Sequence, residues 1–484
     1  MMNKPKKPSP QIKRNEGRHQ DKNERIKNFD EVALGFNLEE ALIESSRCLN
    51  CKTRPCEKAC PVNIKVPDFI THLYNEDIQS AVLKIYETSL FPAICGRVCP
   101  QENYCEAACV LKDRFGSVSI GRLERFVSDH ARKNNMLKLP ECEKENGFKV
   151  ACVGSGPASL SVAAELRKKG YDITVFEALH EFGGVLRYGI PPFRLPREVV
   201  NFEIENLKKM GVKFIKNILI GKSVSLDDLR QDFDAVFVGS GAGLPSPLGV
   251  KGEDLIGVYS SNEFLTRVNL MKGYKFPDYD TPIYVGKRVV VVGGGNTAMD
   301  SARCAKRLGP ENVTVLYRRT KAEMPARAEE VENAIEEGIN FEFLTAPVEL
   351  EGDENGRLKR VKCIRMELGE KDQSGRRKPV PIKGSEFYID TDVIIAAIGQ
   401  SPNPLIQQTT KIETNKWNCL VVNENGQTSI ENVFAGGDVV RGGATVLLAM
   451  KDGKVAANAI DEYLKKKSED RRQKTEGRKQ KSDK

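Results

Sequence analysis

The spacing of hydrophobic and polar residues changes near Gly147. Over 37–134, apolar residues recur three and four positions apart, as in NLEEALIESSRCL and PDFITHLYNEDIQSAVLKIYETS, which predicts amphipathic helices. Beyond 147, the strand-like run FKVACVGSG, the helical run ASLSVAAELRKKG and the strand-like run YDITVFEA follow one another. The same order recurs about 140 residues later in KRVVVVGGG, NTAMDSARCAKRLG and NVTVLYRR. The pattern predicts an α-helical N-terminal domain followed by two Rossmann-like α/β dinucleotide-binding units.

Two later strand-plus-glycine segments, TDVIIAAIG and NVFAGGDVV, indicate that the chain returns to the first α/β unit after completing the second. We therefore expect a disordered basic tail over 1–28, a helical domain over 29–145, the first α/β unit over 146–285 and 396–466, the second α/β unit over 286–395, and a disordered basic tail over 467–484.

The composition is that of a globular protein, with 40% hydrophobic and 29% charged residues in 484, which excludes a disordered or fibrous chain. Lys and Arg gather at both ends, in MMNKPKKPSPQIKR and KKKSEDRRQKTEGRKQKSDK. Such ends either contact an acidic partner or are solvated, and we expect solvated ends and no nucleic-acid partner. No apolar run reaches the ~20 residues of a membrane span, and no apolar segment follows the basic N-terminus. These features predict a cytoplasmic protein without a membrane partner.

Eight of the 13 cysteines fall into two groups, Cys48-x2-Cys51-x4-Cys56-x3-Cys60-Pro61 and Cys95-x3-Cys99-Pro100-x4-Cys105-x3-Cys109. Disulfides are not expected in a reducing compartment. Zinc sites prefer paired CxxC units, often with histidine, whereas the only nearby histidine is His72. Iron–sulfur clusters use a compact cysteine run with a Cys-Pro unit. The pattern favours iron–sulfur over zinc or free thiols, and eight cysteines match two [4Fe–4S] clusters by count, although spacing does not assign the ligands.

The first glycine motif runs Gly154-Ser155-Gly156-Pro157-Ala158-Ser159 and joins a strand to a helix. Its glycines allow a tight turn against a pyrophosphate at the helix N-terminus. Glu177 ends the next strand, where a carboxylate can accept hydrogen bonds from ribose hydroxyls. The alternative is a simple glycine turn, but strand, helix and acid in register favour an adenine dinucleotide site.

The second motif has its key positions at Gly293, Gly295 and Ala298, with Asn296 and Thr297 between them. The following strand ends in Arg318 and Arg319 in place of an acid. Arginine binds a 2′-phosphate through its planar fork, which favours NADP(H) over NAD(H), whereas the alternative is a solvated strand end. We expect Lys321 and Arg327 to add positive charge near the same phosphate. The Gly437-Asp438 segment either approaches a flavin or forms a simple Gly-Asp turn, and its position does not decide between the two.

Longer segments resemble the small (beta) subunit of NADPH-dependent glutamate synthase. The chain is also similar to the large subunit of NADH-dependent ferredoxin:NADP oxidoreductase and to the N-terminal half of dihydropyrimidine dehydrogenase. The resemblance covers about residues 29–465 and rests on RCLNCKTRPCEKACPVNI, FPAICGRVCPQENYCEAAC, GSVSIGRLERF, FGGVLRYGIPPFRLP, LYRRTKAEMPA, AAIGQSPNP and FAGGDVVRGGATVLLAMKDGKVAA.

This resemblance implies a ligand set for each of two [4Fe–4S] clusters, with Cys95 outside both. One cluster takes Cys48, Cys51, Cys56 and Cys109, and the other takes Cys60, Cys99, Cys105 and the carboxylate of Glu124. It also implies FAD on the first α/β unit, bound by Gly154, Gly156, Pro157, Ala158, Glu177, Gly184, Leu186, Arg194, Gly437, Asp438 and Thr445. NADPH then occupies Gly293, Gly295, Asn296, Thr297, Ala298, Arg318 and Arg319.

The resemblance implies an oxidoreductase that passes electrons from NADPH through FAD and the clusters to a partner subunit, which uses them for L-glutamate synthesis. The alternative is the large subunit of the ferredoxin:NADP oxidoreductase, whose partner is a small flavin/[2Fe–2S] subunit. A third reading, an iron–sulfur scaffold with vestigial nucleotide folds, is disfavoured by the intact Glu177 and Asp438 and by the arginine pair. Hydride transfer needs no acid–base triad, so we expect no catalytic side chain. The scarcity of histidine, with four in the whole chain, is consistent with this expectation.

Overall fold

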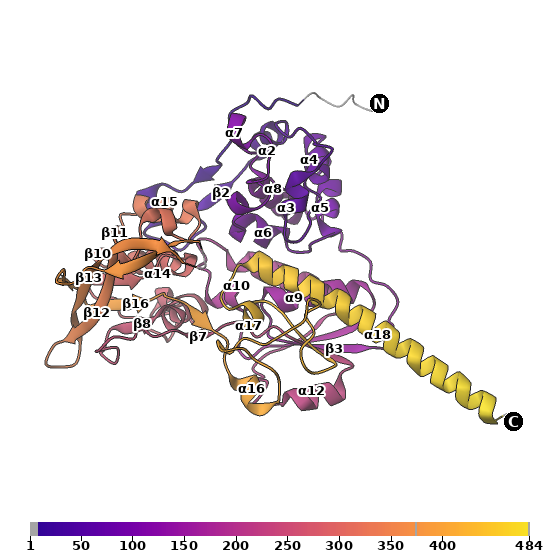
Figure 1. Cartoon of the computed structure of the whole chain (residues 1–484). Coiled ribbons are helices and arrows are strands. Elements are labelled where there is room, and N and C mark those ends of the chain that lie inside the picture. Colours follow the sequence, from indigo (N-terminus) through magenta and orange to yellow (C-terminus); the bar gives the residue numbers. More distant parts are fainter. Residues whose placement is uncertain (1–7, 373–374, 483–484) are drawn as a thin grey trace.

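A computed structural model describes residues 8–372 and 375–482. Figure 1 shows three parts, with a helical domain above two α/β units that lie side by side. The helical domain contains α2 (Leu38–Ser45), α3 (Pro55–Ala59), α4 (Val66–Tyr74), α5 (Ile78–Tyr86), α6 (Pro92–Val98), a short 3-10 turn (Gln101–Asn103), α7 (Lys112–Phe115) and α8 (Ile120–Lys133). Its helices begin with local signals: Asn37 and Glu40 form a capping box on α2, and prolines open α3, α4 and α6.

The chain before 29, which the sequence predicted to be disordered, is ordered from residue 8 onward; residues 1–7 lie outside the described part. It contains β1 (Arg18–His19) and α1 (Lys22–Arg25), and β1 pairs with β2 (Ala33–Gly35). Arg25 is 2% exposed and forms ion pairs with Glu336 and Glu337 of the second α/β unit. These long-range partners order the segment, and they are not visible in its local composition.

The first α/β unit is a parallel sheet in the order β18-β6-β3-β4-β5. Its strands are β3 (Lys149–Val153), β4 (Asp172–Phe176), β5 (Lys213–Ile215), β6 (Ala235–Val238) and β18 (Val433–Ala435). Its helices are α9 (Pro157–Lys168), α10 (Val185–Tyr188), α11 (Arg197–Lys209), α12 (Leu226–Asp232), α16 (Leu405–Thr409), α17 (Asp438–Arg441) and α18 (Val446–Ser482). The apolar runs of β3 and β6 are buried, as expected of a parallel sheet covered on both faces.

The second unit has the order β11-β10-β9-β16-β8, again parallel. Its strands are β8 (Val258–Ser260), β9 (Arg288–Val292), β10 (Asn312–Tyr317), β11 (Asn340–Phe343) and β16 (Val393–Ala396). Its helical segments are α13 (Ser261–Leu265), a π-helical turn (Thr266–Leu270), 3-10 turns (Gly273–Lys275 and Lys321–Glu323), α14 (Asn296–Arg307) and α15 (Ala328–Glu336). A short ribbon of β7 (Leu244–Pro245) and β17 (Gln400–Ser401) joins the two units.

Two features of the second unit differ from the expected division. Because β8 pairs with β16, the chain enters this unit just after β7, not at 286, and the three-residue strand gave too short a pattern to detect. An antiparallel sheet of β12 (Thr345–Gly352), β13 (Leu358–Lys371), β14 (Arg377–Pro381) and β15 (Phe387–Asp390) follows β11. Its residues Leu350, Val361 and Cys363 pack against Val290 and Val292, so it covers one face of the parallel sheet.

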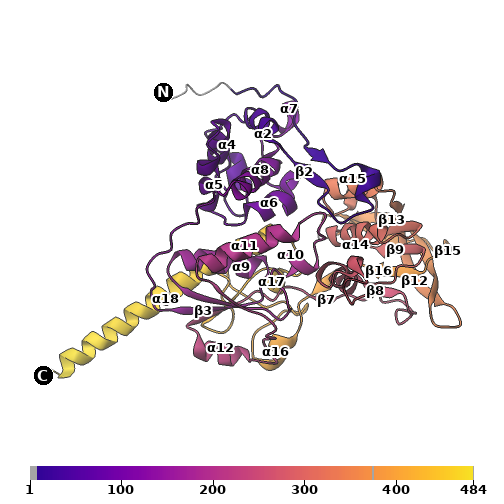
Figure 2. The ribbon, with the colours of Figure 1, turned by 180° about the vertical axis from the view of Figure 1, so that it is seen from behind.

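The helical domain and the first α/β unit share one hydrophobic core, which includes Phe69 and Ile94 from the former and Leu160, Ile204 and Ile460 from the latter. Figure 2 shows α9 and α11 between the helical domain and the sheet. A shared core makes these two parts one body.

Helix α18 continues to Ser482 and projects from the body, where the sequence predicted a disordered tail over 467–484 (Figure 1). Lys, Arg, Glu and Gln dominate this stretch and have high helix propensity, so a helix nucleated on the core continues through it. Across the two described ranges, no helix combines the length and apolarity needed to cross a membrane.

Candidate functional site

Four cysteines at the outer part of the helical domain surround one small pocket, which Val66, Ile70 and Ile120 also line. We call Cys48, Cys51, Cys56 and Cys109 the outer cysteine set, and all four are half-buried. Burial, helped by the neighbouring thiols, raises the pKa of Cys48 to about 11 and that of Cys56 to about 12. Bringing thiolates this close together costs free energy unless a cationic group binds between them. The structure thus assembles the four residues that the resemblance grouped.

The second grouping, which we call the inner cysteine set, consists of Cys60, Cys99, Cys105 and Glu124. Cys60 and Cys99 follow the ends of α3 and α6, and Glu124 lies on α8. Burial raises the pKa of Cys99 and Cys105 well above the usual range, and Glu124 raises both further. Burial also raises the pKa of Glu124 to about 8, and its Oε1 has no hydrogen-bond partner among the described residues. A buried carboxyl group with one unpartnered oxygen, beside three thiols, fits a ligand of a metal cluster.

A single metal ion and an iron–sulfur cluster place different demands on the spacing of their ligands. Four thiolates on one zinc ion lie about 4 Å apart, because each Zn–S bond is ~2.3 Å. Among residues 8–372 and 375–482, no three His, Cys, Asp or Glu side chains converge closely enough to hold one metal ion. The ligands of an iron–sulfur cluster bind different iron atoms, so they need not converge on one point.

Cys95 lies between the inner cysteine set and the first α/β unit. It is 1% exposed, and its Sγ is 3.8 Å from Sδ of Met450 on α18. Burial is the main reason why its pKa is raised, and Glu124 and Cys99 raise it further. The residue predicted to stand outside both ligand sets is therefore at the contact between the two domains.

In the first dinucleotide site, the glycine loop joins β3 to α9 as expected. Gly154 has φ of 87°, and a Cβ there would lie 2.7 Å from the Gly239 oxygen. Gly156 caps α9, whose first residue is Pro157, followed by the buried Ala158. A Cβ on Gly184 would lie 2.9 Å from Cα of Gly156, so the 183–184 turn crosses the loop closely. The site has the backbone access that a pyrophosphate requires.

The polar residues of this site lie at the same edge of the sheet. Glu177 accepts hydrogen bonds from the amides of Ser155 (3.0 Å) and Leu179 (2.9 Å). Burial raises the pKa of Asp438 to about 6, and its carboxylate accepts a hydrogen bond from the Ala444 amide. Gly437 precedes it with φ of 77°, Thr445 caps the start of α18 and Leu186 is buried on α10. These loops converge at the carboxyl ends of the strands, where α/β sheets bind ligands.

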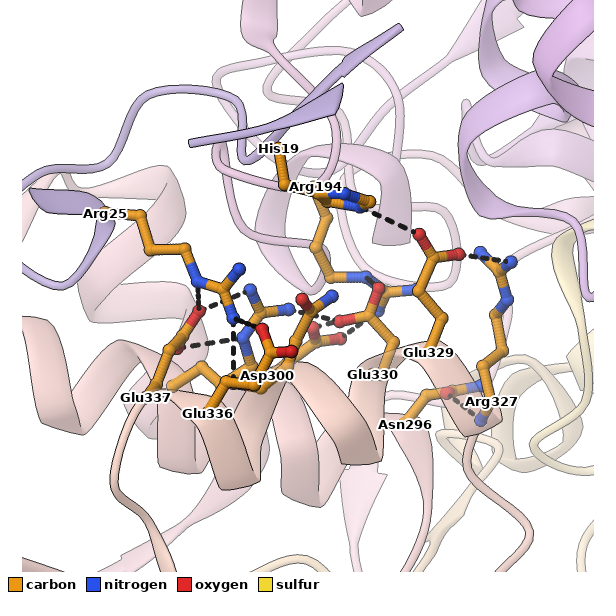
Figure 3. A network of polar contacts seen from close by, with 12 residues as sticks. His19, Arg25, Arg194, Asn296, Asp300, Arg327, Glu329, Glu330, Glu336 and Glu337 are labelled. Atoms are coloured by element: carbon orange, nitrogen blue, oxygen red, sulfur yellow. Dashed lines mark hydrogen bonds and ion pairs between the residues drawn. The ribbon is translucent and has the colours of Figure 1, made fainter. Parts of the chain in front are cut away.

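Arg194, which the resemblance placed at the flavin, forms ion pairs with the second α/β unit. Its guanidinium is 6% exposed and pairs with Asp300 of α14 (2.8 Å) and Glu330 of α15 (3.0 Å), as Figure 3 shows. These ion pairs link the first unit to the second, and the flavin contact that the resemblance implied for Arg194 stays a prediction.

The second site repeats the glycine-loop geometry. Gly293 has φ of 143°, and a Cβ there would lie 2.3 Å from the Ala397 oxygen. Gly295 caps α14, which begins at Asn296, followed by Thr297 and the fully buried Ala298. The Asn296 Oδ1 accepts a hydrogen bond from the Arg327 amide at 2.9 Å (Figure 3).

The two arginines after β10 separate. Arg318 is exposed, and in the described part of the chain it has no hydrogen bond or ion pair. Arg319 is 5% exposed, pairs with Asp372 at 2.7 Å and donates to the Arg377 oxygen at 2.7 Å. Successive residues of an extended chain point to opposite sides, so only Arg318 is free for a 2′-phosphate. Of the two expected neighbours, Lys321 is exposed and Arg327 is buried at the helical domain.

Sequence reasoning missed a network of ion pairs that joins the helical domain to α15. Arg327 donates to Glu102 and to the Arg97 oxygen, each at 3.2 Å. The Glu329 carboxylate lies 3.3 Å from His19 Nε2 (Figure 3) and forms an ion pair with Arg122 at 3.2 Å. Burial would raise the pKa of Glu329, but the His19 hydrogen bond and the Arg327 and Arg122 charges hold it below its usual range. A signal was present: the acidic pairs 329–330 and 336–337 are spaced seven residues apart, which places them on one helix face.

Comparisons with known proteins agree with this architecture. Residues 25–136 match the family described as "Dihydroprymidine dehydrogenase domain II, 4Fe-4S cluster", and residues 148–459 match the pyridine nucleotide-disulphide oxidoreductase family. The solved structure of Mycobacterium tuberculosis FprA in complex with NADPH matches 66% of this chain and 86% of its own, at 20% identity and a TM-score of 0.57. Lactococcus lactis thioredoxin reductase matches 66% of this chain and 99% of its own, at 20% identity and a TM-score of 0.50. Both likenesses support the fold.

Closer relatives cover nearly the whole chain. The glutamate synthase [NADPH] small chain of Escherichia coli is 38% identical over 90% of this chain and 94% of its own, and that of Halomonas elongata is 37% identical over 91% and 94%. The NADPH-Fe(3+) oxidoreductase subunit beta of Geobacter sulfurreducens is 39% identical over 86% of this chain and 65% of its own. The predicted fold class and the classes of cofactor, 4Fe–4S, FAD and NADPH, are confirmed. The chain therefore belongs to the pyridine nucleotide-disulphide oxidoreductases and, among them, to the family of the NADPH-dependent glutamate synthase small chain.

Proposed function

We propose that this protein passes electrons from NADPH through FAD and two [4Fe–4S] clusters to a partner subunit that makes L-glutamate. The observation that supports this order is the shared core between the inner cysteine set and the first α/β unit. Helix α18 starts beside the first dinucleotide site at Thr445 and contacts Cys95 through Met450. The outer cysteine set, more exposed than Cys99 and Cys105, then faces a partner.

In this proposal, the outer set holds one cluster and the inner set, with Glu124, holds the other. When bound, the flavin accepts a hydride as an electron pair, and the clusters carry electrons one at a time. Gly154 and Gly156 admit the pyrophosphate of FAD, and Glu177 accepts hydrogen bonds from its ribose hydroxyls. Gly293 and Gly295 admit the pyrophosphate of NADPH, while Arg318 alone binds the 2′-phosphate. No side chain needs to act as a general acid or base.

The proposed partner is the large subunit of a glutamate synthase in the cytoplasm, because relatives over most of the chain are named as its small chain. The reaction would then be that of an enzyme acting on CH–NH2 donors with NADP as acceptor. The alternative, the large subunit of NADH-dependent ferredoxin:NADP oxidoreductase, gains no support, because none of the relatives reported above carries that name.

The test is to purify the chain anaerobically with its large subunit and to measure glutamine-dependent glutamate formation with NADPH. The complex should form glutamate, and the isolated chain should oxidise NADPH with ferricyanide and form none. NADPH oxidation without glutamate formation by the complex would contradict the assigned partner. A preparation without flavin and iron would contradict the electron relay itself.

A further inference from the structure

One face of α18 connects the first dinucleotide site with the inner cysteine set. Thr445 lies at the N-terminal end of this helix, and its Oγ1 accepts a hydrogen bond from the Leu448 amide. Met450 contacts Cys95, and Lys454 lies one turn further along on the same side. The next turns bury Ala457 and Ile460 in the shared core. The position of Lys454 is therefore fixed by the packed part of the helix.

The Lys454 side chain reaches out of its own domain into the helical domain. Its Nζ donates to the backbone oxygens of Val62 (3.2 Å) and Thr88. Val62 follows the Cys60-Pro61 unit, so this bond holds the loop that carries an inner cysteine. The side chain is 23% exposed, and the one carboxylate that the described residues offer within ion-pair distance is Glu165, at 4.0 Å. Glu165 also forms an ion pair with Lys168 at 2.8 Å. The single carboxylate is therefore shared by Lys168 and Lys454 and neutralises Lys454 only in part.

The ammonium group of Lys454 lies against the loop that carries Cys60, one member of the inner cysteine set. Burial is the main influence on its pKa and lowers it, whereas negative charge at Glu165, Cys60 and Cys95 acts in the opposite direction. Electrostatic interaction is reciprocal, so the ammonium group stabilises negative charge at those same thiols. The two carbonyl acceptors also favour the ammonium form.

We propose that Lys454 is a positioning residue for electron transfer, which anchors the Cys60 loop and holds a positive charge beside the inner cysteine set. The inference rests on the proposed assignment of that set to a cluster. Electron uptake adds one negative charge to a buried site, and a nearby fixed cation makes this addition more favourable. No bond forms or breaks at Lys454; the electron comes from the reduced flavin, and the lysine keeps its protons.

The test uses the full chain loaded with FAD and iron–sulfur clusters, titrated electrochemically while electron paramagnetic resonance reports each cluster. Lys454→Met removes the charge and keeps the length of the side chain, so at a fixed potential the reduced-to-oxidised ratio of one cluster should fall about three- to tenfold. Lys454→Arg should stay within about twofold of the wild type. Glu165→Gln removes the opposing carboxylate and should raise the same ratio.

Lys169→Met is the matched control. Lys169 on the same helix seam donates to Asn458 (3.2 Å) and Asp461 (2.8 Å) of α18, and neither Cys60 nor Cys95 is among its partners. It should leave both clusters unchanged. An unaltered ratio in Lys454→Met, with full iron content, would overturn the inference. Should Lys454→Met assemble no inner cluster, Glu165→Gln decides: a ratio that does not rise overturns the inference. A wild-type protein without any cluster signal would instead contradict the proposed function.

Discussion

The helical domain meets its two neighbours through joints of opposite character. Its joint with the first α/β unit is apolar and continuous with the protein core, as the Cys95–Met450 contact illustrates. Its joint with the second unit consists of ion pairs around α15, centred on Arg327 and Glu329 (Figure 3). Electron transfer between fixed centres needs constant distances, which an apolar core supplies. The second unit has only to present a diffusible nicotinamide. Its position can therefore rest on ion pairs, whose strength depends on salt and pH.

The apolar joint should be broken most severely by a buried charge. Met450 is 2% exposed, so Met450→Asp should lower the free energy of unfolding by about 4 kcal/mol and release iron from the inner set. Urea unfolding and iron analysis would measure both effects. Met450→Leu keeps the volume and should cost less than about 1.5 kcal/mol. Equal effects of the two substitutions would show that this contact is not a closely packed joint.

The ionic joint should be broken by removing its central cation. Arg327→Ala leaves Glu102 and Glu329 without their shared partner and should cost about 3 kcal/mol. Hydrogen exchange should then increase in α15 and in the 18–35 segment, while α6 stays protected. Exposed Arg357 offers a control, and its replacement by alanine should change stability by less than about 0.5 kcal/mol. Increased exchange throughout α6 would show that the two joints are one cooperative unit.

Glu203 is a polar exception within the apolar joint and makes that joint sensitive to pH. It is 1% exposed on α11, neither oxygen makes a hydrogen bond within the described residues, and burial raises its pKa to about 8. The backbone at Ala93 and the cations Arg132 and Arg97 oppose this rise in pKa only in part. The unfolded chain ionises above its ordinary value of 4.5 while the folded protein stays protonated, so stability should fall as pH rises between about 4.5 and 8.

The variant Glu203→Gln cannot ionise and should lose this slope. Relative to the wild type, it should gain about 2 kcal/mol of stability between pH 5.5 and 7.5, as measured by urea unfolding at each pH. Glu205→Gln, an exposed neighbour on the same helix, is the control. Parallel curves for Glu203→Gln and the wild type would show that Glu203 ionises normally.

The smallest effect concerns the affinity of the second α/β unit for NADPH. Arg318→Ala should raise KM for NADPH about tenfold and leave KM for NADH unchanged, because its charge is free. Arg319→Ala removes a guanidinium already paired with Asp372 and should change both constants alike. Steady-state kinetics with ferricyanide would compare them, and a larger NADPH-specific effect at Arg319 would reverse the assignment.

Local sequence signals were sufficient for the glycine loops and for Glu177, because a strand, a turn and a helix are contiguous in the chain. They were insufficient for Arg194, whose partner Asp300 is 106 positions away, and for Arg319, which is covered by the β13–β14 hairpin. The resemblance grouped Cys48, Cys51, Cys56 and Cys109, which spacing alone could not do, and these four line one pocket. The N-terminal segment was misjudged because Arg25 is ordered by acids more than 300 residues away.

The single core beneath the helical domain limits how this chain can be rearranged. A fragment cut after residue 139 would expose the apolar side of α6 that now faces α11 and α18. Such a fragment is not an interchangeable cassette: grafting its cysteines onto another flavoprotein would also require the matching surface of the host. Gene fusions that respect this constraint should join their additions beyond α18 or before β1.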